Sequence, residues 1–221
     1  MVKKKKSKKK NKWVKWWQKF KPRFLQRLGL VSLFLLIFIA LLSFLVFKFW
    51  QYGQEAYQDR VELEAKQGFI EELAPTAQSL QRQYGVLASI SLAQAALESD
   101  FGRSELASDY YNLYGVKTDA DDPDKVAFNT MEFVDGEWIE ITDYFKVYPS
   151  WQASMAQHAE LIHYGTSWDP NYYQLVKDGK TYQEQASGLQ EAGYATDPTY
   201  ANKIVEMIEA WSLDQYDQPV K

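Results

Sequence analysis

The chain has 221 residues, which is enough for one domain with a hydrophobic core plus accessory segments. Its net charge of −4 conceals a segregation, because residues 1–27 hold 13 basic and no acidic residues, whereas the remainder holds 12 basic and 29 acidic residues. The acidic remainder argues against nucleic-acid binding, which needs a basic surface. The absence of cysteine excludes disulfides and thiolate chemistry, and two histidines argue against a zinc site, so neither a metal nor a cofactor is expected.

The N-terminal third predicts a membrane segment. Residues 28–47 are a run of 20 residues without a charge, and such a helix is about 30 Å long, the thickness of a bilayer's hydrocarbon core. The basic tail of residues 1–27 then lies in the cytoplasm, on the anionic headgroups of the cell membrane, and the rest of the chain outside the cell. A cleaved signal peptide is the alternative. It is less favoured because Lys48-Phe49-Trp50 follows the run in place of a small-residue cleavage site.

Residues 48–68 are polar and charged, and they predict a helical or irregular stalk. The globular part is assigned to residues 69–213, followed by a tail of residues 214–221. It opens with a helix over residues 69–84, in which Pro75 marks either a kink or the start.

A second helix leads to Glu98. Its apolar residues recur at three- and four-residue steps, and they are Val86, Leu87, Ile90, Ala93 and Leu97. Gly102 is expected to stop the helix in a left-handed conformation, so Glu98 falls near its C-terminus. The helix dipole and burial both raise the pKa of a carboxyl placed there. A glycosidase needs such a proton donor, although an exposed glutamate on a frayed helix end is the simpler interpretation.

Residues 126–148 are the clear β region. Asp135-Gly136 signals a two-residue hairpin turn, which places Glu132 opposite Ile139. Glu132 then shares a face with apolar and Thr side chains, either as a mismatch at an exposed edge or as a carboxylate aimed into a cleft. The acidic stretch 119–124 lacks the glycine and the distal glutamate of a calcium loop, and it is predicted to be solvated.

Three helices are predicted after the hairpin. Ser150 caps the first of them, and His158 and His163 lie five positions apart, so they do not share a face and are not expected to bind a metal. The second covers residues 181–192. In the third, Asp197 is the expected N-cap with Pro198 at the first helical position.

Three segments together resemble the bacterial glucosaminidases of glycoside hydrolase family 73. They are Ala-Gln-Ala-Ala-Leu-Glu-Ser-Asp-Phe-Gly at 93–102, Asn-Leu-Tyr-Gly-Val-Lys at 112–117 and Gly-Tyr-Ala-Thr-Asp-Pro-Thr-Tyr-Ala at 193–201. Their order matches that of the family, and the resemblance covers roughly residues 69–213.

The resemblance implies an α+β, mainly helical, lysozyme-like domain with one β-hairpin, here preceded by a single transmembrane helix. It implies Glu98 as the general acid and Glu132, in Thr-Met-Glu-Phe, as the second carboxylate, with Glu137 and Glu140 as fallbacks. The residues that it places along the cleft as substrate contacts are Tyr194, Tyr200, Asn112 and Tyr114.

The expected function is cleavage of the β-1,4 bond after N-acetylglucosamine in peptidoglycan strands, during wall remodelling. Two alternatives stay open. A muramidase or lytic transglycosylase of the lysozyme superfamily uses a similar glutamate but cuts the other bond, and a non-catalytic wall-binding scaffold carries a similar anchor.

Overall fold

The computed structural model describes the backbone of residues 12–134 and 137–217, and the side chains of residues 27–129 and 140–217. The chain divides into two compact units, one that ends at Glu62 and one that begins at Leu63. Helix α1 (Lys12–Tyr84) contributes to both units. The predicted boundaries at residues 27, 47 and 68 lie inside this helix and stay predictions, and the predicted stalk of residues 48–68 is helical.

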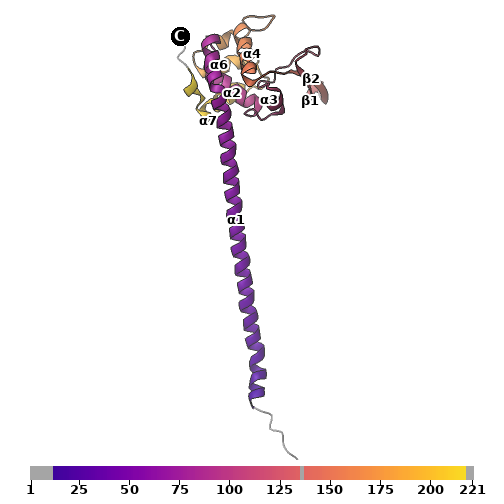
Figure 1. The fold of residues 1–221 in the computed structure, drawn as a ribbon, viewed down its shortest axis with the longest axis vertical. Helices are drawn as coiled ribbons and strands as arrows, with labels where there is room; N and C mark the ends of the chain where they lie inside the picture. The colour runs from indigo at the N-terminus through magenta and orange to yellow at the C-terminus, as the bar shows by residue number, and fades with distance from the viewer. Residues whose placement is uncertain (1–11, 135–136, 218–221) are drawn as a thin grey trace, which may run out of the picture. The chain divides into compact units, whose positions relative to one another are not determined.

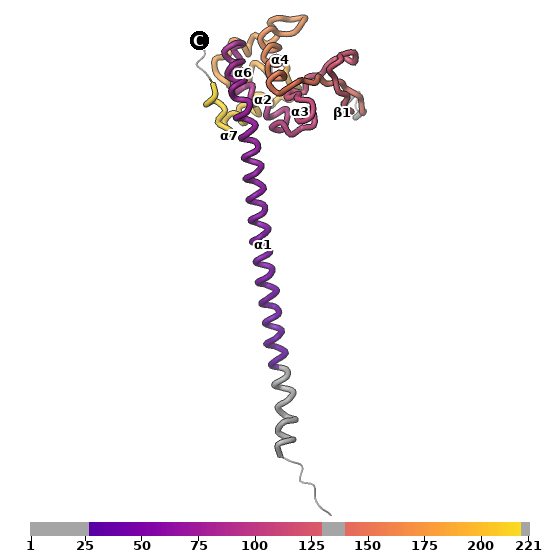
Figure 2. The backbone as a smooth tube through the Cα atoms, viewed as in Figure 1, coloured from indigo at the N-terminus to yellow at the C-terminus, as the bar shows by residue number. Residues whose placement is uncertain are grey.

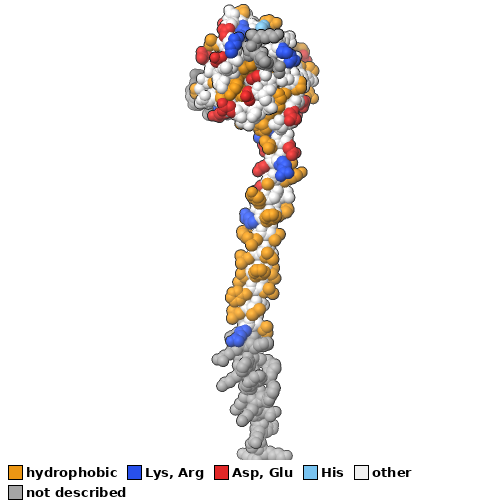
Figure 3. Space-filling model, turned by 90° about the vertical axis from the view of Figure 1, so that its left-hand side faces the viewer, with side chains coloured by type: hydrophobic (Ala, Val, Ile, Leu, Met, Phe, Trp, Pro, Cys, Tyr) orange, Lys and Arg blue, Asp and Glu red, His pale blue; other side chains and the backbone are white. Residues whose placement is uncertain are grey.

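The first unit carries the apolar run. Between Arg27 and Tyr84, α1 contains an 18-residue window with a mean hydropathy of 3.1, and none of that window is buried. Hydrophobic side chains cover this part of the helix on the visible face (Figure 3). By length and composition it is the one helix among the described residues that can cross a membrane, and a signal sequence would meet the same criteria.

The second unit is mainly helical (Figure 1). Besides the end of α1 it contains α2 (Ala88–Ser99), α3 (Glu105–Tyr110), α4 (Trp151–Tyr164), α5 (Gln174–Asp178), α6 (Tyr182–Glu191), α7 (Tyr200–Trp211) and the 3₁₀ helix η1 (Leu213–Tyr216). A two-stranded antiparallel sheet pairs β1 (Lys125–Val134) with β2 (Glu137–Lys146). This composition confirms the α+β expectation.

The hairpin projects from the helices (Figure 2). Its register places Val134 opposite Glu137 and Glu132 opposite Ile139, as the predicted two-residue turn requires. The turn itself, Asp135-Gly136, lies outside the described residues. At its base the hairpin is held to the helical part by a bridge between Lys117 and Phe145.

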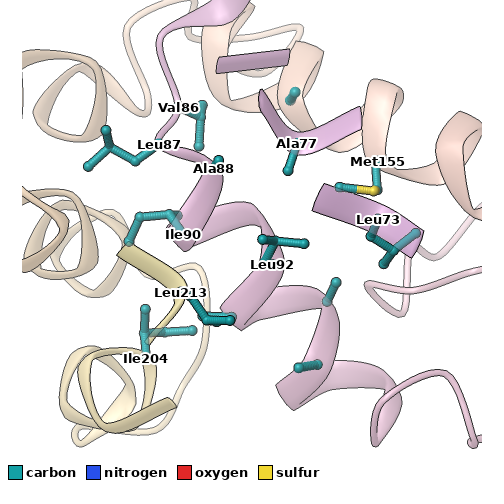
Figure 4. Packing of buried hydrophobic residues seen from close by; sticks show 14 of the residues in the cluster. Leu73, Ala77, Val86, Leu87, Ala88, Ile90, Leu92, Met155, Ile204 and Leu213 are labelled. Carbon is teal, nitrogen blue, oxygen red and sulfur yellow. The ribbon is translucent and has the colours of Figure 1, made fainter. Parts of the chain in front are cut away.

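The core is built around α2. Ten of its twelve residues are buried, because it packs between the end of α1, α4, α7 and η1. Figure 4 shows Ile90 and Leu92 of α2 among Leu73 and Ala77 of α1, Met155 of α4 and Leu213 of η1. The apolar face predicted from the three- and four-residue spacing is therefore the buried one, and α2 is encased almost all round.

Two helix ends differ from the prediction. The helix of Glu98 ends at Ser99, because Asp100 already adopts the left-handed conformation (φ 51°), before Gly102. Helix α7 begins at Tyr200, so Asp197 is not its N-cap. The Asp197 carboxylate accepts hydrogen bonds from the Thr199 amide and hydroxyl instead (2.8 and 2.7 Å), which closes a turn just before the helix. The predicted Ser150 cap of α4 is confirmed, with Ser150 accepting from the Ala153 amide.

Candidate active site

Helix α2 is fixed at its N-terminus by side chains from other elements. Its first amide groups have no partner within the helix, and Leu87, the N-cap, offers no side-chain oxygen. Gln81 accepts from the Ala88 amide (3.2 Å) and Asp217 accepts from the Ser89 amide (2.8 Å). The Leu87 amide donates to Gln185 of α6. These contacts hold the axis of the helix that carries Glu98.

The C-terminal end of α2 is a tight left-handed turn. Asp100, Phe101 and Gly102 all have positive φ values, of 51°, 55° and 76°. The Ser99 hydroxyl accepts from the Gly102 amide (2.7 Å) and donates to the Ala95 carbonyl (2.5 Å), which ties the turn to the helix. Glu98 therefore sits in the last turn of a helix that is anchored at both ends.

A polar row follows one side of α2. Gln94 and Glu98 are four positions apart and so face the same way. The Gln94 amide donates to the Tyr200 hydroxyl (3.0 Å), and that hydroxyl donates to Oε1 of Glu98 (2.8 Å). Tyr200 is buried at the start of α7, so this short chain of hydrogen bonds fixes one carboxyl oxygen of Glu98.

The pKa of the Glu98 carboxyl is raised above its ordinary value. Burial is the main cause, and the Tyr200 hydrogen bond and the charge of Lys203 oppose it. Glu98 is exposed by its surface area, but the protein atoms around its carboxyl remove part of the hydration, and this loss gives the direction of the shift. A carboxyl with a raised pKa keeps its proton at higher pH than an ordinary glutamate, as a general acid requires.

Tyr200→Phe tests this hydrogen bond. Because the bond lowers the pKa of Glu98, its loss raises that pKa further, and the alkaline limb of the pH–rate profile moves to higher pH. The rate at the optimum falls about 10–100-fold, since a hydrogen bond to a charged group contributes about 1.5–3 kcal/mol. The exposed Tyr172→Phe serves as the control. A profile of unchanged shape and height would show that Tyr200 does not act on Glu98.

Tyr194 packs on Tyr200 from the loop between α6 and α7. The two rings are stacked, with centroids 5.6 Å apart and an interplanar angle of 20°. The Tyr194 hydroxyl lies 3.0 Å from Nε2 of the buried His158. The hydroxyl is thus turned inward, which leaves the half-buried ring as the part of Tyr194 that can meet a substrate.

Asn112 and Tyr114 lie deeper than Tyr194. Asn112 is 1% exposed, and its amide nitrogen donates to the Val116 and Lys146 carbonyls (both 2.9 Å) while its oxygen accepts from the Val116 amide. Tyr114 is buried, and its hydroxyl donates to the Ser91 carbonyl of α2 (3.3 Å). Both side chains shape the loop after α3, and their contact with substrate stays a prediction.

Asn112→Ala is expected to act on stability. It removes three hydrogen bonds and leaves the Val116 amide unpaired in the interior, which destabilises the fold by about 2–4 kcal/mol. The KM of the folded fraction should stay within about twofold of the wild type. Chemical denaturation and initial rates measure the two effects, with the exposed Asn202→Ala as control. A raised KM with unchanged stability would identify Asn112 as a substrate contact.

The second carboxylate stays a prediction. Glu132 lies in β1 opposite Ile139, but its side chain is outside the described residues, as is that of Glu137. Glu140 is described and exposed in β2. The register confirms the strand position predicted for Glu132.

The acidic loop and the histidines have partners of their own. Asp122 binds Lys146 and the Thr118 hydroxyl (2.8 and 2.6 Å), and these contacts hold the pKa of its carboxyl well below the usual range. His163 bonds to the Tyr84 carbonyl. Within the part of the chain that the structure describes, no group of three His, Asp or Glu side chains is arranged to hold a metal ion.

Residues 74–213 match the family model for glucosaminidases, described as mannosyl-glycoprotein endo-β-N-acetylglucosaminidase. The matched segment contains Glu98, Tyr194, Tyr200 and the hairpin. The chain belongs to the glucosaminidase family. It is a glycoside hydrolase with a lysozyme-like domain, and the expectation drawn from the three sequence segments is confirmed at this level.

The family relatives differ in length and in name. The exo-glucosaminidase LytG of Bacillus subtilis is 41% identical over 189 residues, which are 86% of this chain and 67% of LytG. A probable N-acetylmuramidase of Lactococcus lactis subsp. cremoris is 32% identical over 67% of this chain, but only 34% of that protein is covered. The catalytic domain of the autolysin Auto from Listeria monocytogenes superposes with a TM-score of 0.65 at 38% identity, over 69% of this chain and 88% of that domain.

Two residues that hold predicted site residues lie outside the set predicted from the sequence. Gln94 holds the Tyr200 hydroxyl, and His158 holds the Tyr194 hydroxyl. Gln94 had a visible signal, because it is a polar residue inside an apolar helix, four positions before Glu98. His158 had none, since its partner lies 36 residues away in a loop.

Proposed function

We propose that this glucosaminidase hydrolyses peptidoglycan and cuts the β-1,4 bond that follows N-acetylglucosamine. The observation that carries the proposal is the chain from Gln94 through Tyr200 to Glu98, since it presents a partly buried carboxyl on the helix that the family motif marks. A related domain of known structure, from Salmonella typhimurium FlgJ, is a glycoside hydrolase domain (33% identity, TM-score 0.54). Related FlgJ proteins of Escherichia coli are named peptidoglycan hydrolases.

We assign a role to each oxygen of Glu98. Tyr200 donates to Oε1, which accepts in either protonation state, so the acidic proton resides on Oε2. Oε2 then delivers the proton to the glycosidic oxygen as the bond to the anomeric carbon breaks and positive charge develops on the sugar ring. Glu132 activates water, or it stabilises that charge and attacks the anomeric carbon as a nucleophile, and the 2-acetamido group of the substrate is the alternative nucleophile. The anomeric configuration of the first product distinguishes inversion from the two retaining routes.

Digestion of purified sacculi by the full chain, in a non-ionic detergent, tests the proposal. Mass spectrometry of the borohydride-reduced fragments should find reduced N-acetylglucosamine at the fragment ends. Reduced or anhydro N-acetylmuramic acid at the fragment ends would instead assign the chain to the muramidases or lytic transglycosylases. The Lactococcus relative is named a probable N-acetylmuramidase, so the muramidase outcome is tested explicitly. Sacculus binding without fragment release would favour the scaffold.

The same digest separates internal from terminal cleavage. The family description specifies an endo-enzyme, whereas LytG is named an exo-enzyme. Early fragments of mixed length indicate internal cuts, and early release of disaccharides alone indicates cutting from strand ends. Internal cutting is the outcome that we expect.

We also propose that the apolar run of α1 anchors the enzyme in the cell membrane, with residues 1–27 in the cytoplasm and the catalytic unit outside. The 20 uncharged residues and the 13 basic residues before them support this orientation. Such a tether limits the enzyme to the innermost wall layer and favours a role in remodelling. Resistance to alkaline extraction, with protease access to residues 63–221 in intact protoplasts, is expected. A mature N-terminus after residue 47 would show a cleaved signal peptide instead.

A further inference from the structure

His158 is a buried polar residue of α4, and the other buried polar side chain of this helix, Ser154, accepts a hydrogen bond from the Leu113 amide. His158 is 2% exposed, and the neighbours on its side of the helix include Met155, Ala159 and Ile162. Nε2 bonds to the Tyr194 hydroxyl, whereas Nδ1 has no hydrogen-bond partner among the described residues. An apolar side chain of similar volume would fill this position without an unpaired buried nitrogen. Packing alone therefore does not explain a histidine here.

The imidazole is held between two tyrosine rings. Tyr114 stacks on it with a centroid distance of 3.9 Å and an angle of 11°, and Tyr194 meets it edge to face at 5.6 Å and 79°. The Tyr114 hydroxyl bonds to the Ser91 carbonyl of α2. The orientation of His158 is thus set relative to α2, the helix that carries Glu98.

Tyr194 needs a support of this kind. It lies in the loop between α6 and α7, where its own amide bonds back to the Leu189 carbonyl (3.0 Å). Its ring stacks on Tyr200, and the Tyr200 hydroxyl holds Oε1 of Glu98 at 2.8 Å. A rotation of the Tyr194 ring therefore moves the surface on which Tyr200 rests, and with it the carboxyl group.

His158 provides this support without adding charge. Burial lowers its pKa to about 3, so the ring is neutral near neutral pH. A cation near Glu98 would favour ionisation of its carboxyl, whereas a neutral imidazole does not.

We propose that His158 is a positioning residue for the general acid: its bond to Tyr194 fixes the ring behind Tyr200, and so fixes which oxygen of Glu98 carries the proton. The inference rests on the proposed function, because it assigns His158 a part in the proton transfer from Glu98. His158 is 2% exposed, and it acts on Glu98 through Tyr194 and Tyr200.

Three substitutions in the full chain test the inference. His158→Phe keeps a flat ring and removes the hydrogen bond, Tyr194→Phe removes the same bond from the other side, and His158→Gln restores a polar atom near the position of Nε2. His163→Phe is the matched control, because it removes the other histidine of α4, which bonds to the Tyr84 carbonyl and not to Tyr194. The readouts are kcat and KM on sacculi, and thermal unfolding of each variant.

We expect His158→Phe and Tyr194→Phe each to lower kcat about tenfold with KM within about twofold. The double variant should be no slower than the slower single variant, since both remove one interaction. His158→Gln should recover most of the lost kcat. His163→Phe should keep the kcat of the wild type. Tyr194→Phe applies the same test if His158→Phe fails to fold.

Three results would overturn the inference. They are wild-type kcat in Tyr194→Phe, additive losses in the double variant, and a loss in His163→Phe as large as that in His158→Phe, which would indicate a general effect on stability. A wild-type chain that releases no fragments contradicts the proposed function and removes this inference with it. An active wild type with unaffected His158 and Tyr194 variants contradicts the inference alone.

Discussion

Glu98→Gln is expected to lower kcat on peptidoglycan by about 10²–10⁴-fold, the usual contribution of general acid catalysis. Glutamine preserves the shape of the side chain and still accepts the hydrogen bond from Tyr200, but it has no acidic proton to transfer. Binding to sacculi should persist. Fragment release by the full chain, followed by mass spectrometry, measures the loss, with the exposed Glu209→Gln of α7 as control. A variant that keeps a tenth of the activity or more would assign the proton transfer to another group.

The same substitution should make the fold more stable at neutral pH. The folded-state pKa of Glu98 is raised, so the carboxyl favours the folded state when protonated, and this contribution is lost as the pH rises through the folded pKa. Glutamine cannot ionise, so the unfolding midpoint should rise at pH 7 and change little below about pH 4, where glutamate is protonated in both states. A lower midpoint at pH 7 would mean that inactivity reflects damage to the fold.

Gly102→Ala is expected to destabilise the catalytic unit by about 2–5 kcal/mol. Its φ of 76° disfavours any side chain, and a Cβ there would lie 2.8 Å from ring atoms of both Phe69 and Trp151. These rings pack edge to face and join α1 to α4 beside the end of α2. Because the turn at Gly102 follows Glu98 by one helical turn, activity should fall together with stability.

Gly85→Ala separates the two causes. Gly85 has a similar φ of 83°, but a Cβ there would meet no atom within 4 Å. It therefore reports the backbone strain alone, about 1–2 kcal/mol. Denaturant titrations of the two variants, followed by tryptophan fluorescence, give the difference that is due to the two rings. Equal losses in both variants would show that Phe69 and Trp151 move aside without penalty.

Local patterns in the sequence determined the elements of this protein. The spacing of Ile90 and Ala93 predicts the buried face of α2, because a helical period brings such residues to one side, whereas Val86 and Leu87, which the same spacing placed in the helix, lie just before its first residue. The Asp-Gly signal predicts the register of the hairpin, because turn length fixes which residues face each other. Glu98 was identified by motif and by its place at a helix end, both of which are local properties.

Local patterns were less reliable at helix ends. Gly102 was expected to stop the helix of Glu98, and Asp197 to start α7. In the structure Asp100 takes the left-handed conformation, and Gly102 is needed where two aromatic rings approach the backbone. Asp197 closes a turn and pairs with Lys203 (2.5 Å). Gly102 thus serves a close approach of rings that are distant in sequence, whereas Asp197 serves contacts two and six residues away.

The surroundings of Glu98 were decided by the tertiary structure alone. Tyr200 is 102 residues from Glu98 in sequence, and His158 is 36 residues from Tyr194. Their hydrogen bonds depend on how α2, α4 and α7 pack, and no periodicity along the chain encodes that arrangement. The sequence therefore predicted which side chain transfers the proton, whereas the packing of the helices decided the direction of its pKa shift and its orientation, because lost hydration and hydrogen bonding both depend on what surrounds a group in space.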